Sequence, residues 1–213
     1  MEQALNGQKR KAALDCDEIH PGCTMDQICQ ITLREEMRSV QDTAELMDPA
    51  AVEKAVKLLL KADRIQLYGV GSSAVAALDM YNKLCRVGLN ARFSQDVHCQ
   101  LLDSASLTPR SVVLVFSFNG RTRDMIEACE LSREMGAKVI SVTRFGSSPI
   151  AELSDVPLYV ASNESLKRVT TMSSRLSTLV MVDVIFTCLA NSMSGRISAL
   201  IQRNNMIANR RRK

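Results

Sequence analysis

The chain has 213 residues, of which 46% are hydrophobic and 23% are charged, proportions that are typical of a folded globular domain and exclude a disordered chain. Its net charge of +4 is concentrated near the C-terminus, where residues 163–213 hold nine basic and two acidic residues. No run approaches the roughly 18 uncharged apolar residues of a membrane-spanning helix, and the first residues do not form a secretion signal. We therefore expect a cytoplasmic protein without a membrane segment.

Residues 1–24 show no apolar period and contain the turn-forming pair Pro21–Gly22, which predicts a mobile tail. The seven cysteines of the chain are odd in number and scattered, which favours reduced thiols over a disulfide framework. Four potential metal ligands lie close together here, but their spacing differs from the paired spacing of a zinc knuckle, so we expect no metal at Cys16, His20, Cys23 and Cys29.

Two amphipathic helices follow this tail. Apolar residues recur at three- and four-residue steps from Met25 to Met47, and the pair Asp48–Pro49 then begins a second helix with one apolar face. The first helix lies outside the regular part of the chain, so its apolar face needs either a second copy of the chain or its own domain. We expect residues 25–62 to form a helical arm and the chain to be a homodimer or a tetramer.

From Asp63 onward, strand-like segments alternate with helical ones. Strands are predicted at residues 64–68, 91–94, 111–116, 138–142 and 156–160. Helices are predicted at residues 74–86, 97–105, 123–135 and 171–191, with a short helical turn at 149–153. Strands such as residues 112–115 are continuously apolar, as strands covered on both faces must be. The pattern predicts an α/β fold with a doubly wound, five-stranded parallel sheet over residues 63–193, followed by a basic helix or tail over residues 194–213.

Two strand-to-helix loops share an unusual composition, residues 69–73 (GVGSS) and residues 117–122 (SFNGRT). Their glycines allow close backbone approach, their hydroxyls can donate hydrogen bonds, and each precedes a helix N-terminus with unpaired N–H groups. Ligands of doubly wound sheets bind at the carboxyl ends of the strands. Together the loops predict a phosphate site, although turns and helix caps also favour Gly, Ser and Thr, so that Ser73 or Thr122 could be only a cap.

Neither loop is a nucleotide-binding motif. The first lacks the third glycine of GxGxxG, and the chain contains no GxxxxGK[ST] sequence. We therefore expect no dinucleotide, no ATP and no other cofactor.

Further motifs accompany the two loops: Asp96-Val97-His98, residues 136–140 leading into Thr143, residues 148–151, and Glu164 ahead of Ser174–Arg175. As a set in this order, they resemble the sugar isomerase (SIS) domain, and more narrowly the effector half of RpiR/MurR-type bacterial transcriptional regulators. The resemblance covers about residues 49–191, and the helix at residues 25–47 is similar to the connecting arm of those regulators.

This resemblance implies a domain that binds a phosphorylated sugar. The residues that match the family's phosphate loops are Gly71, Ser72, Ser73, Ser117, Gly120 and Thr122. Asn119 stands where the family usually has a second serine, and its amide can still donate a hydrogen bond to a phosphate oxygen. His98 and Glu164 match positions near the sugar, where a donor and an acceptor would bind its hydroxyls.

The resemblance also leaves an enzyme open, because some SIS domains isomerise aldose and ketose phosphates with a glutamate base and an assisting histidine. Glu164 and His98 are the candidates for those roles. However, the isomerases have a catalytic glutamate at the start of the final helix, where this chain has Arg175, and a guanidinium cannot act as that base. We therefore favour a phosphosugar sensor that regulates carbohydrate metabolism over a sugar-phosphate isomerase.

Sequence-specific DNA binding needs a DNA-binding domain, and none is recognisable in this sequence. The related regulators carry a helix-turn-helix before the arm, and the 24 residues ahead of Met25 are too few and too irregular to form one. We expect a truncated regulator, or one that has lost direct DNA binding, with DNA contacted only through a reader domain outside this chain. A scaffold that only oligomerises is the third alternative, but it would need neither phosphate loop.

Overall fold

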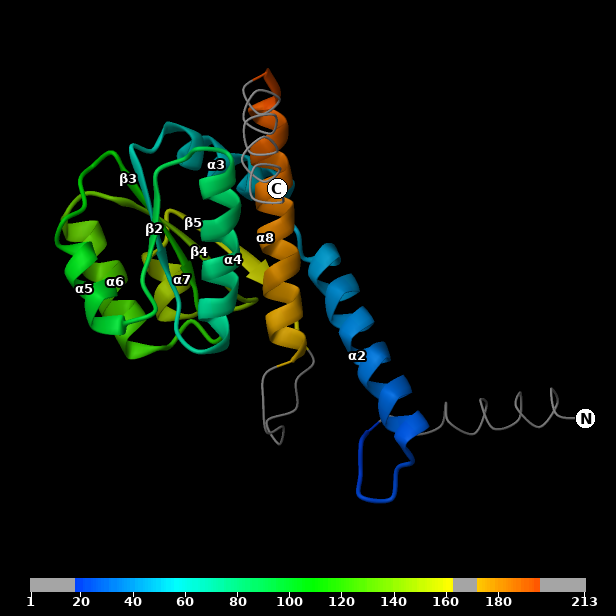
Figure 1. Cartoon of the computed structure of the whole chain (residues 1–213). Helices are drawn as coiled ribbons and strands as arrows, with labels where there is room; N and C mark the ends of the chain where they lie inside the picture. The colour runs from blue at the N-terminus through cyan, green and yellow to red at the C-terminus, as the bar shows by residue number, and fades with distance from the viewer. Residues whose placement is uncertain (1–17, 163–171, 196–213) are drawn as a thin grey trace, which may run out of the picture.

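The computed structural model describes residues 18–162 and 172–195. Within these residues, five strands form one all-parallel sheet in the order β2-β1-β3-β4-β5 (Figure 1). The strands are β1 (Arg64–Tyr68), β2 (Ala91–Phe93), β3 (Ser111–Phe116), β4 (Lys138–Arg144) and β5 (Val156–Val160). The predicted α/β fold with a doubly wound, five-stranded parallel sheet is therefore confirmed.

Helices cover both faces of the sheet and enclose two apolar cores (Figure 1). One face packs against α3 (Pro49–Lys61), α4 (Ser72–Arg86) and α8 (Ser173–Ser192). The opposite face packs against α5 (Val97–Ser104), α6 (Arg123–Glu134) and α7 (Pro149–Leu153). All six residues of β3 are buried, because β1 and β4 flank its two edges and helices cover both faces of the sheet. Coverage of both faces explains the uninterrupted apolar run from Val112 to Phe116.

Most predicted boundaries agree with the structure, and two differences have a clear physical cause. Helix α4 begins at Ser72, two residues earlier than predicted, because Gly71 takes the N-cap position with φ +60. Strand β4 continues to Arg144 because its pairing with β5 extends through Arg144 and Val160. The other boundaries that moved, each by one or two residues, are the end of α2, the end of β2, the ends of α5 and α6, and both ends of α8.

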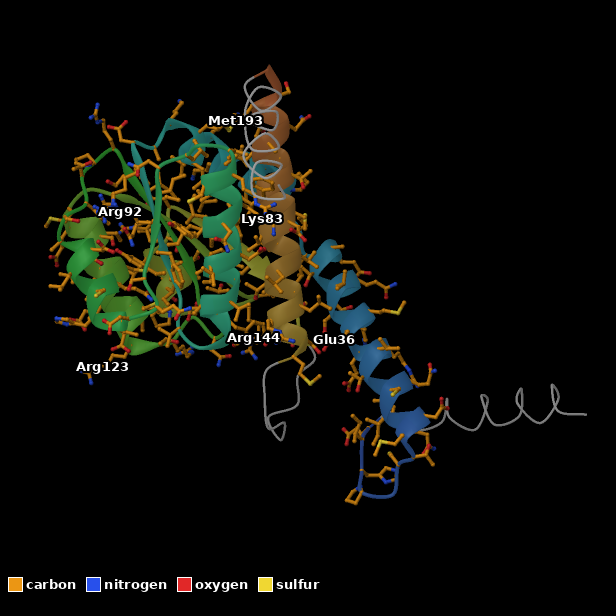
Figure 2. The ribbon with its side chains drawn as sticks, in the orientation of Figure 1. Glu36, Lys83, Arg92, Arg123, Arg144 and Met193 are labelled. Carbon is orange, nitrogen blue, oxygen red and sulfur yellow. The ribbon has the colours of Figure 1, made fainter. Side chains whose placement is uncertain are left out.

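Helix α2 (Met25–Glu45) begins with a capping box between Thr24 and Gln27 and lies beside α8 (Figure 1). Hydrogen bonds join it to the domain. The Thr43 hydroxyl accepts a 3.0 Å hydrogen bond from the N–H of Ala161, just beyond β5. The Ser39 carbonyl accepts one of 3.3 Å from Ser177 of α8, and Glu36 accepts one of 3.2 Å from Ser173 at the start of α8 (Figure 2).

The apolar side chains of α2 divide between buried and exposed positions. Ile31 is 1% exposed, whereas Leu33 is 60% and Met37 is 65% exposed. Helix α2 thus folds back on its own domain through its polar residues, and it leaves part of its apolar surface uncovered in the single chain.

Helix α8 is long and apolar enough, by length and composition alone, to cross a membrane, which the sequence analysis did not expect. It packs against α2, α3, α4 and β5, and its buried residues include Met181, Val182, Ile185 and Leu189. These contacts place one side of α8 against the core of this domain, where apolar residues are required.

Candidate functional site

The two glycine- and hydroxyl-rich loops lie next to each other because β1 and β3 are neighbours in the sheet. Tyr68, the last residue of β1, is in register with Val115 of β3. The chain leaves β1 toward β2 on one side of this pair, and it leaves β3 toward β4 on the other. Ligands of doubly wound sheets bind at the carboxyl ends of the strands where the strand order reverses in this way, and we call this region of the present chain the crevice.

The helices that follow these two loops have no side-chain cap. Helix α4 has Gly71 at its N-cap, and α6 has Thr122 there without a capping hydrogen bond. In contrast, α2, α3, α5 and α7 are each capped by a side-chain oxygen, and among the described helices only α8 shares the uncapped state. The first N–H groups of α4 and α6 therefore retain the partial positive charge that attracts an anion.

This observation resolves the alternative that Ser73 or Thr122 serves only as a helix cap. Ser73 lies inside the first turn of α4, and the Thr122 hydroxyl lies 3.4 Å from that of Ser117 instead of bonding the N–H groups of α6. Neither hydroxyl therefore makes a capping hydrogen bond at the start of its helix.

The two glycines of the first loop have different surroundings: Gly69 is tightly packed, and Gly71 faces open space. A Cβ atom on Gly69 would lie 2.8 Å from the carbonyl oxygen of Ser73, so this position needs glycine for the close approach to α4. At Gly71 a Cβ atom would meet nothing within 4 Å, and glycine is needed there for φ +60. The open side of Gly71 leaves the start of α4 accessible.

The second loop is a tight turn braced by α7. The N–H of Gly120 donates to the carbonyl of Ser117 at 2.8 Å, and the carbonyl of Gly120 accepts from Ile150 at 3.3 Å. Gly120 has φ +61, and a Cβ atom there would overlap Ser148 Oγ and lie 2.6 Å from Ser148 Cβ. Ser117 is buried at the base of the turn, whereas Asn119 and Thr122 are exposed at its rim.

Arginines surround this crevice, and the sequence analysis did not select them. Arg121 belongs to the second loop, Arg123 begins α6, and Arg144 ends β4, and all three are exposed. Figure 2 shows Arg123 and Arg144 at the lower edge of the domain, the edge at which α8 begins. Their position at the end of β4 or in the segment after β3 was the available signal, since such residues lie at the edge of a parallel sheet where ligands bind. Their positive charges are of the kind that pairs with a phosphate.

His98 is the second residue of α5 and is exposed. It follows β2, the strand beside β1, so its loop neighbours the first loop. The adjacent Asp96 caps α5 by accepting a 2.8 Å hydrogen bond from the N–H of Cys99, which lowers the pKa of the Asp96 carboxyl. Glu164 lies outside the described residues, and Arg175 is exposed in the first turn of α8.

A cavity of about 390 Å³ lies away from this crevice. Its lining comes from α3, β5 and α8 and from the segments beside them, and includes Val52, Tyr159 and Met181. No residue of the two loops contributes to it. The crevice at the strand ends remains the candidate site because, within residues 18–162 and 172–195, the hydroxyl-rich loops, the uncapped starts of α4 and α6 and the three arginines occur together there.

Comparisons with known proteins agree with this fold. The SIS domain family matches residues 58–188. An uncharacterized HTH-type transcriptional regulator of Bacillus subtilis (strain 168), YbbH, is 36% identical over 170 residues, which cover 79% of this chain and 60% of YbbH. A second such regulator, TTE0211 of Caldanaerobacter subterraneus, is 29% identical over 175 residues, covering 82% of this chain and 62% of that protein. The chain thus spans about three fifths of the length of these curated relatives.

Solved structures share the fold. The Vibrio vulnificus NanR protein complexed with ManNAc-6P superposes with a TM-score of 0.79 at 25% identity, covering 85% of this chain and 69% of that one. The sugar isomerase domain of the RpiR transcription factor from Sphaerobacter thermophilus superposes with a TM-score of 0.75 at 20% identity, covering 83% and 99% of the two chains. With the family match over most of the sheet and its helices, this chain belongs to the SIS domain family.

Proposed function

We propose that this chain is the phosphosugar-sensing effector domain of an RpiR/MurR-type transcriptional regulator of carbohydrate metabolism. The observation that carries the proposal is the pair of uncapped helix N-termini, each preceded by a hydroxyl-rich loop, at the point where the sheet reverses direction. The match to HTH-type transcriptional regulators and to NanR with its bound ManNAc-6P supports the same proposal.

In this proposal the phosphate lies between the starts of α4 and α6. The N–H groups of the two helices and the hydroxyls around them donate hydrogen bonds to its oxygens, and Arg121, Arg123 and Arg144 balance its charge. The donors are Ser72, Ser73, Ser117 and Thr122, with the Asn119 amide replacing a serine hydroxyl. His98 and Glu164 then bind the sugar hydroxyls. The division of the chain into a tail, an arm, a sugar-binding domain and a basic C-terminal segment stays a prediction.

Calorimetry against a panel of hexose and amino-sugar phosphates that includes ManNAc-6P tests the binding site. We expect Ser117→Ala and Thr122→Ala each to weaken binding by about 1–3 kcal/mol, because a charged oxygen loses a donor. Thr108→Ala is the matched control, since Thr108 is an exposed threonine that precedes β3 at the opposite edge of the sheet. Equal affinity for the unphosphorylated sugars, or equal binding by all three variants, would contradict the proposed site.

We also propose that the chain is a homo-oligomer, a dimer or a tetramer, joined through α2. The support is the 60% and 65% exposure of Leu33 and Met37, which are four residues apart and so lie on one face of the helix. Light scattering of the wild type and of Met37→Glu measures this, and a monomeric wild type at micromolar concentration would contradict it. DNA would be contacted only through a reader domain outside this chain, and the protein would act in the cytoplasm.

A further inference from the structure

The buried side chain of Gln100 connects the two loops that lie nearest to it at the carboxyl ends of β1 and β2. Gln100 lies on α5, in the turn that follows His98, and is 0% exposed. A buried amide is costly unless its donors and acceptor are paired. Gln100 meets this requirement entirely with backbone groups of other segments.

The Gln100 amide makes three hydrogen bonds. Its Oε1 accepts from the N–H of Gly69 at 3.2 Å, and its Nε2 donates to the carbonyl of Gly69 at 3.0 Å. The same Nε2 donates to the carbonyl of Ser94 at 2.8 Å. Both donor positions of the amide are therefore used, and its orientation is fixed, because one partner needs an acceptor and two need donors.

These contacts lie at the point where the sheet ends and the ligand loops begin. The β1–β2 ladder ends at Leu67 and Phe93, and Gly69 lies buried just beyond it. Gln100 thus pairs both backbone groups of Gly69 where no strand partner continues. On its other side, Gly69 packs against the Ser73 carbonyl, so the first loop is held between α5 and the first turn of α4.

The third bond reaches a different loop. Ser94 follows the last residue of β2 and begins the segment that leads to Asp96 and His98. A single side chain therefore joins the phosphate loop at residues 69–73 to the loop that carries the candidate sugar-binding histidine. Groups held by directional bonds to one rigid side chain keep a fixed relative geometry, which lowers the ordering cost of binding.

We propose that Gln100 is a positioning residue that holds these two loops in one relative geometry and thereby sets the affinity for the phosphorylated sugar. The second half of this statement rests on the proposed function, whereas the first half concerns the protein without ligand. Gln100 does not itself touch the ligand in this proposal. It acts through Gly69 on the phosphate loop and through Ser94 on the loop of His98.

The test uses Gln100→Met, which keeps the volume and length of the side chain and removes all three hydrogen bonds. Gln66→Met is the matched control. Gln66 is also 0% exposed and also bonds to α5, but its amide contacts the side chains of Arg64 and Asp103 toward the other end of β1. Both variants lose buried amide bonds, so comparable losses of thermal stability are expected and do not bear on positioning.

The first measurement is backbone amide hydrogen exchange in the protein without ligand. We expect the amides of Gly69, Ser73 and Asp96, which donate hydrogen bonds in these two loops, to exchange at least tenfold faster in Gln100→Met. In Gln66→Met these amides should remain within about twofold of the wild type. Unchanged exchange in Gln100→Met, or equal acceleration in both variants, would overturn the positioning role whether or not a ligand is known.

The second measurement is calorimetric affinity for two probes, ManNAc-6P and inorganic phosphate. Because Gln100 joins both loops, we expect Gln100→Met to weaken the binding of ManNAc-6P at least tenfold and the binding of inorganic phosphate by a smaller factor. Gln66→Met should bind both probes within twofold of the wild-type affinity. Wild-type affinity in Gln100→Met would overturn the link to binding. If the wild type binds neither probe nor any other member of the sugar-phosphate panel, the proposed function fails, and the exchange experiment still decides the positioning role.

Discussion

Replacing Gly120 by alanine tests the brace between the second loop and α7. Gly120 has φ +61, a left-handed conformation that costs an L-residue about 1–2 kcal/mol. The new Cβ would also overlap Ser148 Oγ and lie 2.6 Å from Ser148 Cβ. Ser148 caps α7 by accepting from Ala151 at 3.3 Å, and displacing a cap costs about 1 kcal/mol. We expect Gly120→Ala to lose about 2–3 kcal/mol in all, or about 4–12 °C in Tm for a chain of this size.

A double-mutant cycle separates the two contributions. Ser148→Gly removes both atoms that the new Cβ would meet, and glycine at an N-cap costs only a few tenths of a kcal/mol relative to serine. In the Ser148→Gly background, Gly120→Ala should lose only the conformational part, which gives a coupling of about 1 kcal/mol in urea unfolding. Gly146→Ala is the control for a positive φ without a steric overlap, since Gly146 has φ +121 and a Cβ atom there would meet nothing within 4 Å. Additivity of Gly120→Ala and Ser148→Gly within about 0.3 kcal/mol would refute the steric argument.

Three further predictions concern titration, thiol reactivity and catalysis. Although burial acts to raise the pKa of Asp155, hydrogen bonds from Lys138 at 2.7 Å and from the N–H of Val139 at 2.9 Å outweigh it and lower the pKa. A carboxyl whose pKa is lower in the folded than in the unfolded protein stabilises the fold at pH values above the unfolded pKa. This stabilisation is lost as the pH falls through the folded pKa. Asp155→Asn should therefore reduce the loss of stability below about pH 4, measured by urea unfolding at a series of acid pH values. Burial raises the pKa of the Cys129 thiol to about 12, so mass spectrometry after maleimide labelling at pH 8 should find Cys129 unmodified in the folded protein and the exposed Cys29 and Cys188 modified; labelling of Cys129 at the rate of Cys29 would contradict its burial. With Arg175 where isomerases have glutamate, NMR of fructose 6-phosphate incubated with the protein should show no aldose, and an aldose signal that disappears in Glu164→Gln would show that the chain is an enzyme.

The sequence predicts the sheet well because its central strands are apolar on both faces. The bounds of β1, β3 and β5 agree with the prediction to the residue. Strand β4 is longer than predicted, since its last residues, Thr143 and Arg144, are polar and are held as a strand by pairing with β5. Backbone pairing across strands leaves no trace in the local apolar pattern, so the prediction ended where the apolar run ended.

The two loops that we propose to bind phosphate could be selected from the sequence because their composition is local, whereas the residues that hold them in place could not. Glycines and hydroxyls before a helix identify residues 69–73 and 117–122 from the sequence alone. Gln100 was missed because it acts on Gly69, thirty-one residues earlier in the chain. A weaker signal was present, since Gln100 and Ser104 occupy buried positions of α5, four residues apart, where apolar residues are usual. Two polar residues at such positions indicate specific buried hydrogen bonds.

The polar attachment of α2 has a mechanical consequence. Thr43, Ser39 and Glu36 bond Ala161, Ser177 and Ser173, so α2 is held both at the end of β5 and along the first turns of α8. A slip of α2 by one residue would advance it by about 1.5 Å and rotate it by roughly 100°, which would remove all three bonds at once. An apolar seam tolerates small sliding, but a seam of directional bonds permits only discrete positions. These hydrogen bonds therefore fix the position of α2 relative to the domain. A displacement of β5 and α8 at these bonds would move α2 as one rigid helix.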